Sequence, residues 1–286
     1  MEEFILTEDN YYSLEANRRY MSFHQYMDFV GGMAVYGCEA KAMAKLTGEY
    51  KEETTTALLV GSYVDSYFEG TLDKFKTEHP ECFTQKGELK APFKQAEKMI
   101  ARCERDDFFM STLAGEKQVI MTAYLFGCEW KIKMDSYLPG KAIVDLKTSA
   151  DIHKAWKIQD YGYVSFLEAY NYTKQMAIYQ KIVEINTGKK LPCYISVVTK
   201  EDSPEIKVIH IDQMTLDHAL NEIEMNMQSV LMVKNEEVEP VGCGKCDYCK
   251  SKEVLVAPIS YMDLIGEWYG EIDNSRWKTK WLLFLL

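Results

Sequence analysis

The sequence predicts a mixed α/β fold with a central sheet flanked by helices. Three observations predict it: apolar residues at helical spacing before residue 105, strand-like segments over 116–148, and further helices interrupted by a strand pair over 193–211. Helices before and after a strand cluster are typical of helical layers packed on one sheet.

The composition is that of an acidic globular protein. The chain has 286 residues, 47% of them hydrophobic, and its 33 Lys and Arg against 44 Asp and Glu leave a net charge of −11. This charge excludes a protein that coats nucleic acid or anionic membrane with its whole surface, but not a local basic groove or a carboxylate site for metal ions. The chain has no internal repeat or linker, so we expect one domain over 1–250 and a C-terminal extension over 251–286.

The two ends of the sequence carry neither a secretory nor a membrane signal. The N-terminus is acidic, and the longest apolar run, Trp281–Leu286, has six residues, whereas a membrane-spanning helix needs about 20. We therefore expect a cytoplasmic protein with no membrane partner, whose cysteines are thiols or metal ligands. The apolar tail over 274–286 is expected to be buried in the fold or in a subunit interface, or to be a reading-frame remnant.

Three helices are expected first. Residues 20–50 have helical spacing interrupted at Gly31-Gly32, and a second helix over about 56–69 places Asp65 and Glu69 one turn apart on one side. The third helix follows Pro92 and carries a basic stripe, which either contacts phosphates or is a solvated face. The stripe comprises Lys86, Lys90, Lys94, Lys98, Arg102 and Arg105, and its last four members are the predicted DNA contacts.

Strands dominate the middle of the chain. The pattern predicts strands over 118–126, 129–134 and 142–148, helices over about 155–187, a strand pair over 193–199 and 205–211, and a helix over about 216–233.

The turn signal Pro139-Gly140 predicts a hairpin between the strands 129–134 and 142–148. The apolar residues of both strands are even-numbered, so burying them together requires paired positions with an even sum. We therefore expect an odd-length loop or a bulge, for example with 135 opposite 145. This register places Asp135, Asp145 and Lys147 close together on one face.

Two carboxylates beside an ammonium group suit a divalent cation. Mg²⁺ is commonly held by one or two carboxylates together with phosphate oxygens, and a lysine beside the ion can orient or deprotonate the attacking water. The alternative is a surface hairpin with an ordinary salt bridge.

These residues resemble a known family, the PD-(D/E)XK nucleases. Asp135, the motif Asp145-Leu-Lys147 and then Gln175 and Tyr179 are similar to the RecB-like branch with its Gln-x-x-x-Tyr motif. Gly61 and Asp65 resemble the Gly-x-x-x-His motif of that branch, with Asp in place of the usual metal-binding His. The segments 170–172 and 242–250 most resemble the phage-type exodeoxyribonuclease VIII (RecE-like) group. The resemblance implies a restriction-endonuclease-like core.

The resemblance also implies roles for individual residues. Asp65, Asp135, Asp145 and the backbone carbonyl of Leu146 would hold Mg²⁺ or Mn²⁺, with Glu116 as an additional acidic residue. Lys147 would position the attacking water. Gln175 would support Lys147 or the DNA, with Tyr179 packed behind it, and these two complete the predicted catalytic set.

Three cysteines form a C-x₂-C-x₂-C run, Cys243, Cys246 and Cys249, which is one ligand short of the usual four. The resemblance places Cys38 as the fourth. The group is a [4Fe–4S] site, a Zn²⁺ site or a set of unliganded thiols, while we expect the other cysteines to be core residues: Cys82, Cys103, Cys128 and Cys193.

The resemblance implies a metal-dependent DNA exonuclease that acts on linear duplex ends in phage-type recombination. It further implies a single-strand annealing protein as partner and a homo-oligomeric ring. Two alternatives stay open: a nuclease that trims DNA for CRISPR adaptation, and a catalytically silent module of the same fold that binds DNA ends or a partner protein.

Overall fold

The computed structural model describes residues 4–33, 36–158, 162–258 and 260–262. The chain divides into two compact units, Met1–Cys249 and Lys250–Leu286. The apolar tail over 274–286, for which the sequence left three interpretations, lies outside the described residues. The first unit contains both candidate sites.

The N-terminal region forms three short helices, α1 (Leu14–Arg19), α2 (Phe23–Val30) and α3 (Glu39–Thr47). The helical prediction for 20–50 is confirmed together with its interruption, because α2 ends at Gly31, where φ is 70°. Only glycine adopts this conformation without steric cost. The interruption frees α3 to begin at a separate N-cap, Cys38.

A second helical group follows and includes the predicted helix 56–69. Thr55 caps the N-terminus of this helix, α4, through its hydroxyl, which accepts a hydrogen bond from the Leu58 amide, and Gly70 ends it with φ of 80°. The group consists of α4 (Thr56–Glu69), α5 (Leu72–Glu78), the 3₁₀ turn η1 (Pro80–Cys82), α6 (Ala91–Glu104) and α7 (Asp107–Thr112).

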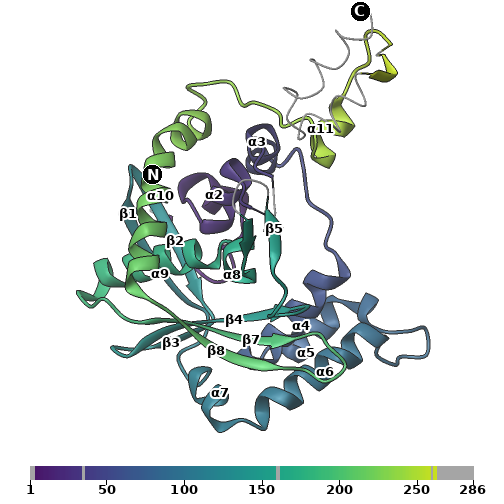
Figure 1. The fold of residues 1–286 in the computed structure, drawn as a ribbon, viewed down its shortest axis with the longest axis vertical. Coiled ribbons are helices and arrows are strands. Elements are labelled where there is room, and N and C mark those ends of the chain that lie inside the picture. The colour runs from purple at the N-terminus through teal and green to yellow at the C-terminus, as the bar shows by residue number, and fades with distance from the viewer. Residues whose placement is uncertain (1–3, 34–35, 159–161, 259, 263–286) are drawn as a thin grey trace, which may run out of the picture. The chain divides into compact units, whose positions relative to one another are not determined.

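The predicted mixed α/β class is confirmed by a four-stranded sheet in the order β3-β4-β7-β8. The pair β4–β7 is parallel, and the pairs β3–β4 and β7–β8 are antiparallel. Helices α4 to α7 lie on one side of this sheet, and α2, α9 and α10 lie on the other (Figure 1). The strands are β3 (Ser136–Leu138), β4 (Ala142–Ser149), β7 (Cys193–Thr199) and β8 (Ile206–Ile211).

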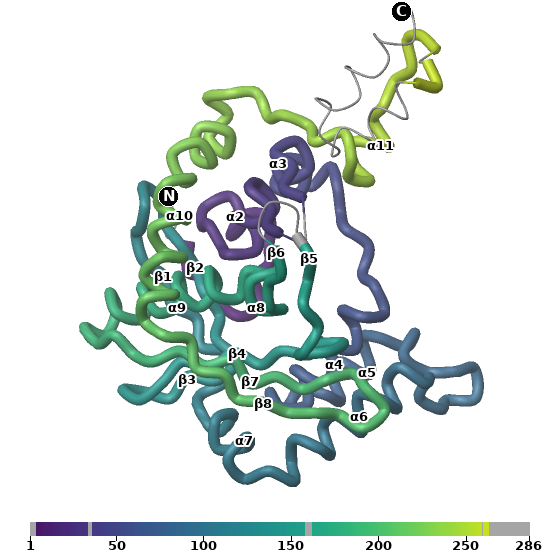
Figure 2. Tube along the Cα trace, in the orientation of Figure 1, coloured from purple at the N-terminus to yellow at the C-terminus, as the bar shows by residue number. Residues whose placement is uncertain are grey.

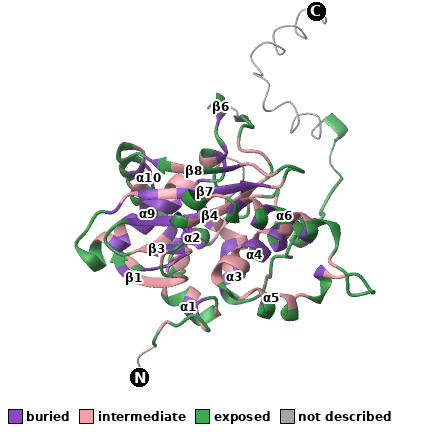
Figure 3. Cartoon of the chain, turned by 90° about the horizontal axis from the view of Figure 1, so that it is seen from below, coloured by how far each residue is buried: buried purple, intermediate pink, exposed green. Residues whose placement is uncertain are grey.

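Two hydrophobic cores fill the spaces on the two faces of the sheet. Side chains alternate along a strand, and accordingly Ile143 of β4 lies in the core with α9 and α10, whereas Val144 and Leu146 lie in the core with α4 and α6. The central strands are therefore buried on both faces, and exposed residues lie on the surrounding helices (Figure 3). Cys82, Cys103 and Cys193 are buried core residues, as expected, and Cys128 is half-buried.

The predicted hairpin between 129–134 and 142–148 is wrong in its pairing but right in its register. Strand β2 (Cys128–Met134) pairs with β1 (Val119–Leu125) instead. The reason is the two-residue turn Phe126-Gly127, in which both φ angles are positive, 53° and 90°, as a tight hairpin requires.

The hairpin with β4 is formed instead by the short strand β3. Leu138 pairs with Ala142 and Ser136 with Val144, so the loop has three residues and all paired positions have an even sum. The even-numbered apolar residues are nevertheless not buried together, because those of β2 lie in one core and those of β4 in the other. The chain changes course at Asp135, between β2 and β3.

The predicted helical stretch 155–187 begins as strand, which corrects its first part. Aromatic and β-branched residues favour a strand here, and β5 (Trp156–Ile158) pairs antiparallel with β6 (Gly162–Val164). Helices α8 (Phe166–Ala169) and α9 (Tyr172–Thr187) follow. The predicted helix 216–233 is confirmed within α10 (Gln213–Lys234), and α11 spans Asp247–Lys252.

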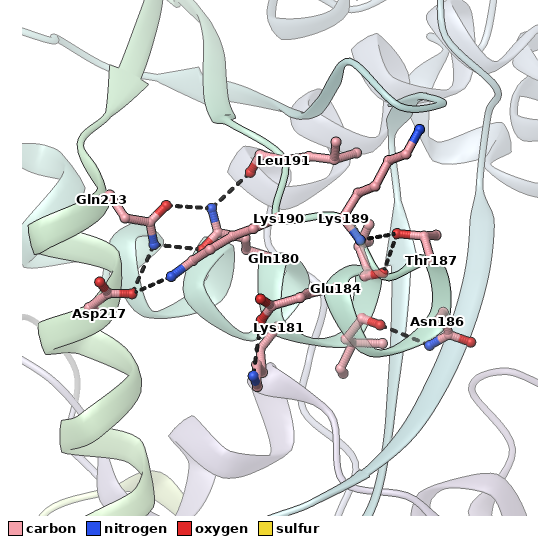
Figure 4. A network of polar contacts seen from close by, with 12 residues as sticks. Gln180, Lys181, Glu184, Asn186, Thr187, Lys189, Lys190, Leu191, Gln213 and Asp217 are labelled. Carbon is pink, nitrogen blue, oxygen red and sulfur yellow. Dashed lines mark hydrogen bonds and ion pairs between the residues drawn. The ribbon is translucent and has the colours of Figure 1, made fainter.

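Helix α9 is fixed at its centre by a network of amide groups (Figure 4). The Gln180 amide donates to the Leu191 carbonyl at 2.8 Å and exchanges hydrogen bonds with Gln213 of α10 at 3.0 and 2.9 Å. Asp217 accepts from both Gln213 and Lys190 at 2.8 Å. These bonds hold α9 against β7 and α10.

No helix among the described residues is long and apolar enough to cross a membrane.

Candidate active site

A cleft of about 1010 Å³ brings most of the predicted site residues together. We call it the aspartate cleft. Its walls come from α2, α4, β2, β4 and α9, which lie far apart in the sequence. The predicted site residues that line it are Asp65, Asp135, Asp145, Leu146, Lys147, Gln175 and Tyr179.

Asp145 is the most deeply buried acidic residue of the cleft, with 2% of its surface exposed. It is on β4, and its side chain faces away from Val144 and Leu146 toward α9. Gln175 donates a hydrogen bond to its Oδ1 at 3.0 Å, and Lys147 forms an ion pair with its Oδ2. A buried carboxylate is costly unless it is paired in this way.

A chain of hydrogen bonds holds Gln175 in turn. The Gln175 amide donates to the Tyr179 hydroxyl at 3.1 Å, and this hydroxyl donates to the Lys133 carbonyl at 3.2 Å. Gln175 and Tyr179 are one helical turn apart on α9, so both reach the same side. The pair therefore orients Asp145 and links α9 to the backbone of β2.

Asp135 lies between β2 and β3, opposite Asp145. The Leu146 amide donates to its Oδ2 at 2.9 Å. Burial, followed by the negative charge of Asp145, raises the pKa of Asp135 to about 7. The structure thus gives the Leu146 N–H a role in holding Asp135, while the predicted role of its carbonyl as a ligand stays a prediction.

Asp65 approaches from α4, on the other side of the cleft. Burial, and then the charge of Asp135, raises its pKa well above the usual value. The helix packs closely on the end of β4, because a Cβ at Gly61 would lie 3.3 Å from the Thr148 hydroxyl. Glycine at this position therefore suits the close approach of α4 that brings Asp65 to the site.

Lys147 is positively charged at neutral pH. Burial alone lowers its pKa, but the carboxylates of Asp145 and Asp135 outweigh burial and raise it above the usual value. An ammonium group held in this state can donate hydrogen bonds to a water or a phosphate oxygen, but it does not accept a proton.

The aspartates of the cleft repel one another when they are charged, which contributes to the raised pKa values of Asp65 and Asp135, and a divalent cation would relieve this repulsion. Among the described residues, the one group of three or more His, Cys, Asp or Glu side chains close enough to share an ion is a group of cysteines. Asp135 and Asp145 lie close enough to interact directly. Such a pair of carboxylates suits Mg²⁺, which commonly takes one or two carboxylates and keeps several waters.

One predicted metal ligand and the predicted DNA-binding stripe lie away from the cleft. Glu116 is exposed, and its backbone exchanges hydrogen bonds with Tyr137 at 2.8 and 2.9 Å. Of the basic stripe, Lys94, Lys98 and Arg102 lie on α6 and Arg105 is its C-cap. Lys94, Lys98 and Arg105 are exposed. A separate depression, formed with 202–204, is lined by three members of the stripe: Lys98, Arg102 and Arg105.

The cleft also contains residues that the sequence interpretation did not assign to the site. Glu69 lies one turn after Asp65, and this spacing was visible in the sequence. His24 of α2 and Lys133 of β2 line the cleft too, but no spacing in the sequence connects either of them to the motif. Burial and the charges of Lys147 and Lys45 lower the pKa of His24 to about 4.

The four cysteines of the predicted cluster do come together. Their sulfur atoms all lie within 4.8 Å of one another, and the Cys38 and Cys249 sulfurs are 3.5 Å apart. The segment over 241–249 lies beside the start of α3 (Figure 2), where Ala40 donates to the Val241 carbonyl at 3.3 Å.

Backbone amides surround these sulfur atoms. Lys245 and Cys246 donate to the Cys243 sulfur at 3.4 and 3.3 Å, and Lys41 and Cys243 donate to the Cys38 sulfur at 3.4 Å. The hydrogen bond from Lys245 is the main reason why the pKa of Cys243 is lowered to about 6. Thiolates, not thiols, bind metal ions, so the donor set fits a metal centre.

Comparisons with known proteins agree with the fold. A crystal structure described as a "putative exonuclease" from Eubacterium rectale is 55% identical to the chain, covers 92% of this chain and 98% of that one, and superposes with a TM-score of 0.90. A second solved structure, SSO0001, is 16% identical over 78% of this chain and 95% of that one, with a TM-score of 0.30. No curated protein matches the chain.

The family comparison covers nearly the whole first unit. The family model that matches residues 20–252 is described as a PDDEXK-like domain of unknown function (DUF3799). The matched range includes every residue that we place in the aspartate cleft except a few near the N-terminus. The chain belongs to this PDDEXK-like family.

Proposed function

We propose that the protein is a metal-dependent nuclease that hydrolyses phosphodiester bonds at DNA ends. The observation that carries this proposal is the pairing of Asp145 with Lys147 beside Asp135 in a cleft that Asp65 completes. The 55% identical relative described as a "putative exonuclease" supports the choice of exonuclease over endonuclease.

The residues of the cleft have separable tasks in this reaction. Asp145 and Asp135 would hold Mg²⁺ or Mn²⁺, together with Asp65 and the Leu146 carbonyl. The bound ion would supply polarisation of the phosphate and a more acidic water. Lys147, held as an ammonium by Asp145, would donate to that water or to the phosphate and so orient the attack. Gln175 and Tyr179 would keep Asp145 in place.

The biological setting follows from the resemblance to RecE-like exonucleases. We propose a cytoplasmic enzyme of phage-type recombination that acts on linear duplex DNA, with a single-strand annealing protein as partner and a ring-shaped homo-oligomer. Trimming of DNA for CRISPR adaptation, or silent binding of DNA ends, would use the same fold.

Cleavage of linear and circular duplex DNA by the intact chain tests the proposal. With Mg²⁺ or Mn²⁺, we expect linear DNA to be degraded and a covalently closed circle to be spared. Asp145→Asn should lower the rate on the order of 100-fold or more, since a metal ion contributes several kcal/mol to such a reaction. Glu116→Gln, outside the cleft, is the matched control and should cleave normally.

Two results would contradict the proposal. Cleavage that persists in EDTA, or that is equal in Asp145→Asn and wild type, would rule out the carboxylate site. Equal degradation of circular and linear DNA would show that the protein is an endonuclease and not an exonuclease. Tight binding of DNA ends without any cleavage would favour the silent module.

For the cysteine site we propose a single Zn²⁺ ion, one of the two metal centres that the sequence left open. Four sulfur atoms at about 2.3 Å from one tetrahedral ion lie about 3.8 Å apart. The Cys38–Cys249 distance of 3.5 Å and the 4.8 Å limit on the whole group agree with that value. A cubane cluster binds each cysteine at a different iron, which spreads the sulfur atoms more widely.

Metal analysis of anaerobically purified protein distinguishes the two centres. We expect about one zinc per chain, no iron, and no absorption band near 400 nm. Cys246→Ser should lower the zinc content and the melting temperature, whereas Cys82→Ser, in the core, should leave the zinc content unchanged. Iron with a visible band would contradict the zinc proposal and leave the nuclease proposal untouched.

A further inference from the structure

Three aromatic side chains form a row that leads outward from Lys147. The Lys147 ammonium lies 5.0 Å from the centre of the Tyr172 ring. The rings of Tyr172 and Tyr170 are stacked, with centres 5.8 Å apart and planes at 25°. Trp156 of β5 meets Tyr170 edge-on at 5.5 Å. We call Trp156, Tyr170 and Tyr172 the aromatic ladder.

The backbone between α8 and α9 produces the stacked pair. Asn171 has a left-handed conformation with φ of 58°, which places its two tyrosine neighbours side by side instead of on opposite sides of the chain. Asn171 is itself buried and packs on Gly32, where an added Cβ would lie 1.9 Å from the Asn171 amide nitrogen. The position of the two rings is therefore fixed by the fold.

The aromatic ladder is exposed at its middle member, Tyr170, and has a cation at each end. Tyr170 keeps 41% of its surface exposed, and both tyrosines line the aspartate cleft. Lys154 lies 4.3 Å from the centre of the Trp156 ring, at the end opposite Lys147. Trp156 is half-buried, and its indole N–H is buried without a hydrogen-bond partner among the described residues.

We propose that the aromatic ladder stacks the unpaired bases of the DNA strand whose phosphate lies at Asp145. The inference rests on the proposed function and adds to it the way in which the strand is held. Bases stack on aromatic side chains irrespective of sequence, and lysines at the two ends can contact the phosphates of the same strand. The net charge of the whole chain, −11, repels DNA. Stacking of bases on the ladder therefore provides attraction that the overall charge of the chain does not.

A purely structural role would place the rings in a core. Tyr172 is half-buried and contributes to the core beside α9, but neither Trp156 nor Tyr170 belongs to either of the two hydrophobic cores. The two outer members of the ladder therefore contribute little to the packed interior, and they are the ones to substitute.

The test measures binding of a short fluorescent oligothymidine by fluorescence anisotropy in an Asp145→Asn background without metal, so that cleavage does not interfere. We expect Tyr170→Ala and Trp156→Ala each to weaken binding roughly 5- to 150-fold, the range seen for loss of one base stack. Tyr170→Phe should bind like the parent because the ring remains. Tyr124→Ala, an exposed tyrosine on β1, is the control for a change away from the ladder.

An oligonucleotide with abasic positions separates stacking from phosphate contacts. The parent should bind it more weakly than oligothymidine by a similar factor, and Tyr170→Ala should no longer distinguish the two. Parent-like binding by folded Tyr170→Ala and Trp156→Ala, or equal loss of affinity for both oligonucleotides, would overturn the inference. If the wild-type chain binds with this ladder dependence but cleaves nothing, the nuclease proposal alone fails.

Discussion

At the scale of single residues, the site depends on how a buried carboxylate is held. Asp145 has 2% of its surface exposed and is bound by one amide and one ammonium group. Asp135 faces the same space, and burial followed by the negative charge of Asp145 raises its pKa to about 7. Asp145 is held by two side chains and Asp135 by the Leu146 amide, so Asp145 is the more firmly fixed anchor for a cation.

The hydrogen bond from Gln175 to Asp145 should affect how tightly Mg²⁺ is bound. Gln175→Leu should raise the Mg²⁺ concentration needed for half-maximal cleavage by about 10- to 100-fold, as is typical for loss of a group that orients a metal ligand. Tyr179→Phe should have a smaller effect of the same kind, because it removes the hydroxyl that accepts from Gln175 and donates to Lys133 but leaves the hydrogen bond from Gln175 to Asp145. A Mg²⁺ titration of the cleavage rate measures both.

Thr173→Ala on the same helix is the matched control, and it should not change the Mg²⁺ requirement. If Gln175→Leu lowered the maximal rate but left the Mg²⁺ requirement unchanged, Gln175 would act on DNA instead of on Asp145.

At the scale of elements, the site depends on α9 keeping its place on the sheet. The helix carries Gln175 and Tyr179 to the cleft and is fixed by the buried Gln180, the residue after Tyr179 (Figure 4). The partners of Gln180 are the loop that leads into β7 and the first turn of α10. The amide network therefore ties the position of α9 to the central sheet.

Gln180→Ala should lower the free energy of unfolding by about 1–3 kcal/mol, because the buried Leu191 carbonyl loses its donor. Gln213→Ala removes the exposed partner and should cost less than about 1 kcal/mol, since water can replace it. Urea denaturation measures both values. Equal losses for the two variants would contradict the importance of the buried amide.

At the scale of the whole first unit, two lysines join parts of the chain that are distant in sequence. Lys131 of β2, 1% exposed, donates to Asn17 Oδ1 at 2.8 Å and to the Tyr11 carbonyl. Lys234, at the end of α10, donates to Gln25 at 2.8 Å and to two N-terminal carbonyls at 3.2 Å. They hold the N-terminal segment against the sheet and the last long helix.

The buried Lys131 should make the free energy of unfolding depend on pH. Burial and the charge of Lys234 lower its pKa from 10.5 to about 8. Below pH 8 both folded and unfolded chains carry this proton. Between about pH 8 and 10.5 the unfolded chain keeps the proton and the folded chain does not. The contribution of this residue to the free energy of unfolding therefore increases with pH in this range, by up to about 1.4 kcal/mol per pH unit.

The comparison of wild type with Lys131→Met isolates this effect from other groups that titrate in the same range. The difference in the free energy of unfolding, wild type minus variant, should increase from pH 8 to 10 in urea denaturation. Lys141→Met, at an exposed lysine, should show a constant difference. A constant difference for Lys131→Met as well would show that its pKa is normal.

Several features could be predicted from the sequence because they depend on local geometry. Asp65 and Glu69 share a side of α4 because they are one helical turn apart, and the even sums of the β3–β4 register follow from the alternation of side chains. The order of Asp135, Asp145, Lys147, Gln175 and Tyr179 was likewise visible, and the fold places all five in one cleft.

Other features depended on contacts between distant parts of the chain. Strand β2 pairs with β1 and not β4, β4 pairs in parallel with β7 more than forty residues later, and His24 and Lys133 enter the cleft from elements outside the motif. The sequence by itself determined which residues we propose for the chemistry and how they are spaced along each helix and strand. Only the tertiary structure decided which strands pair, which core each face enters and which further side chains line the cleft, because these choices depend on the packing of segments that no local spacing relates.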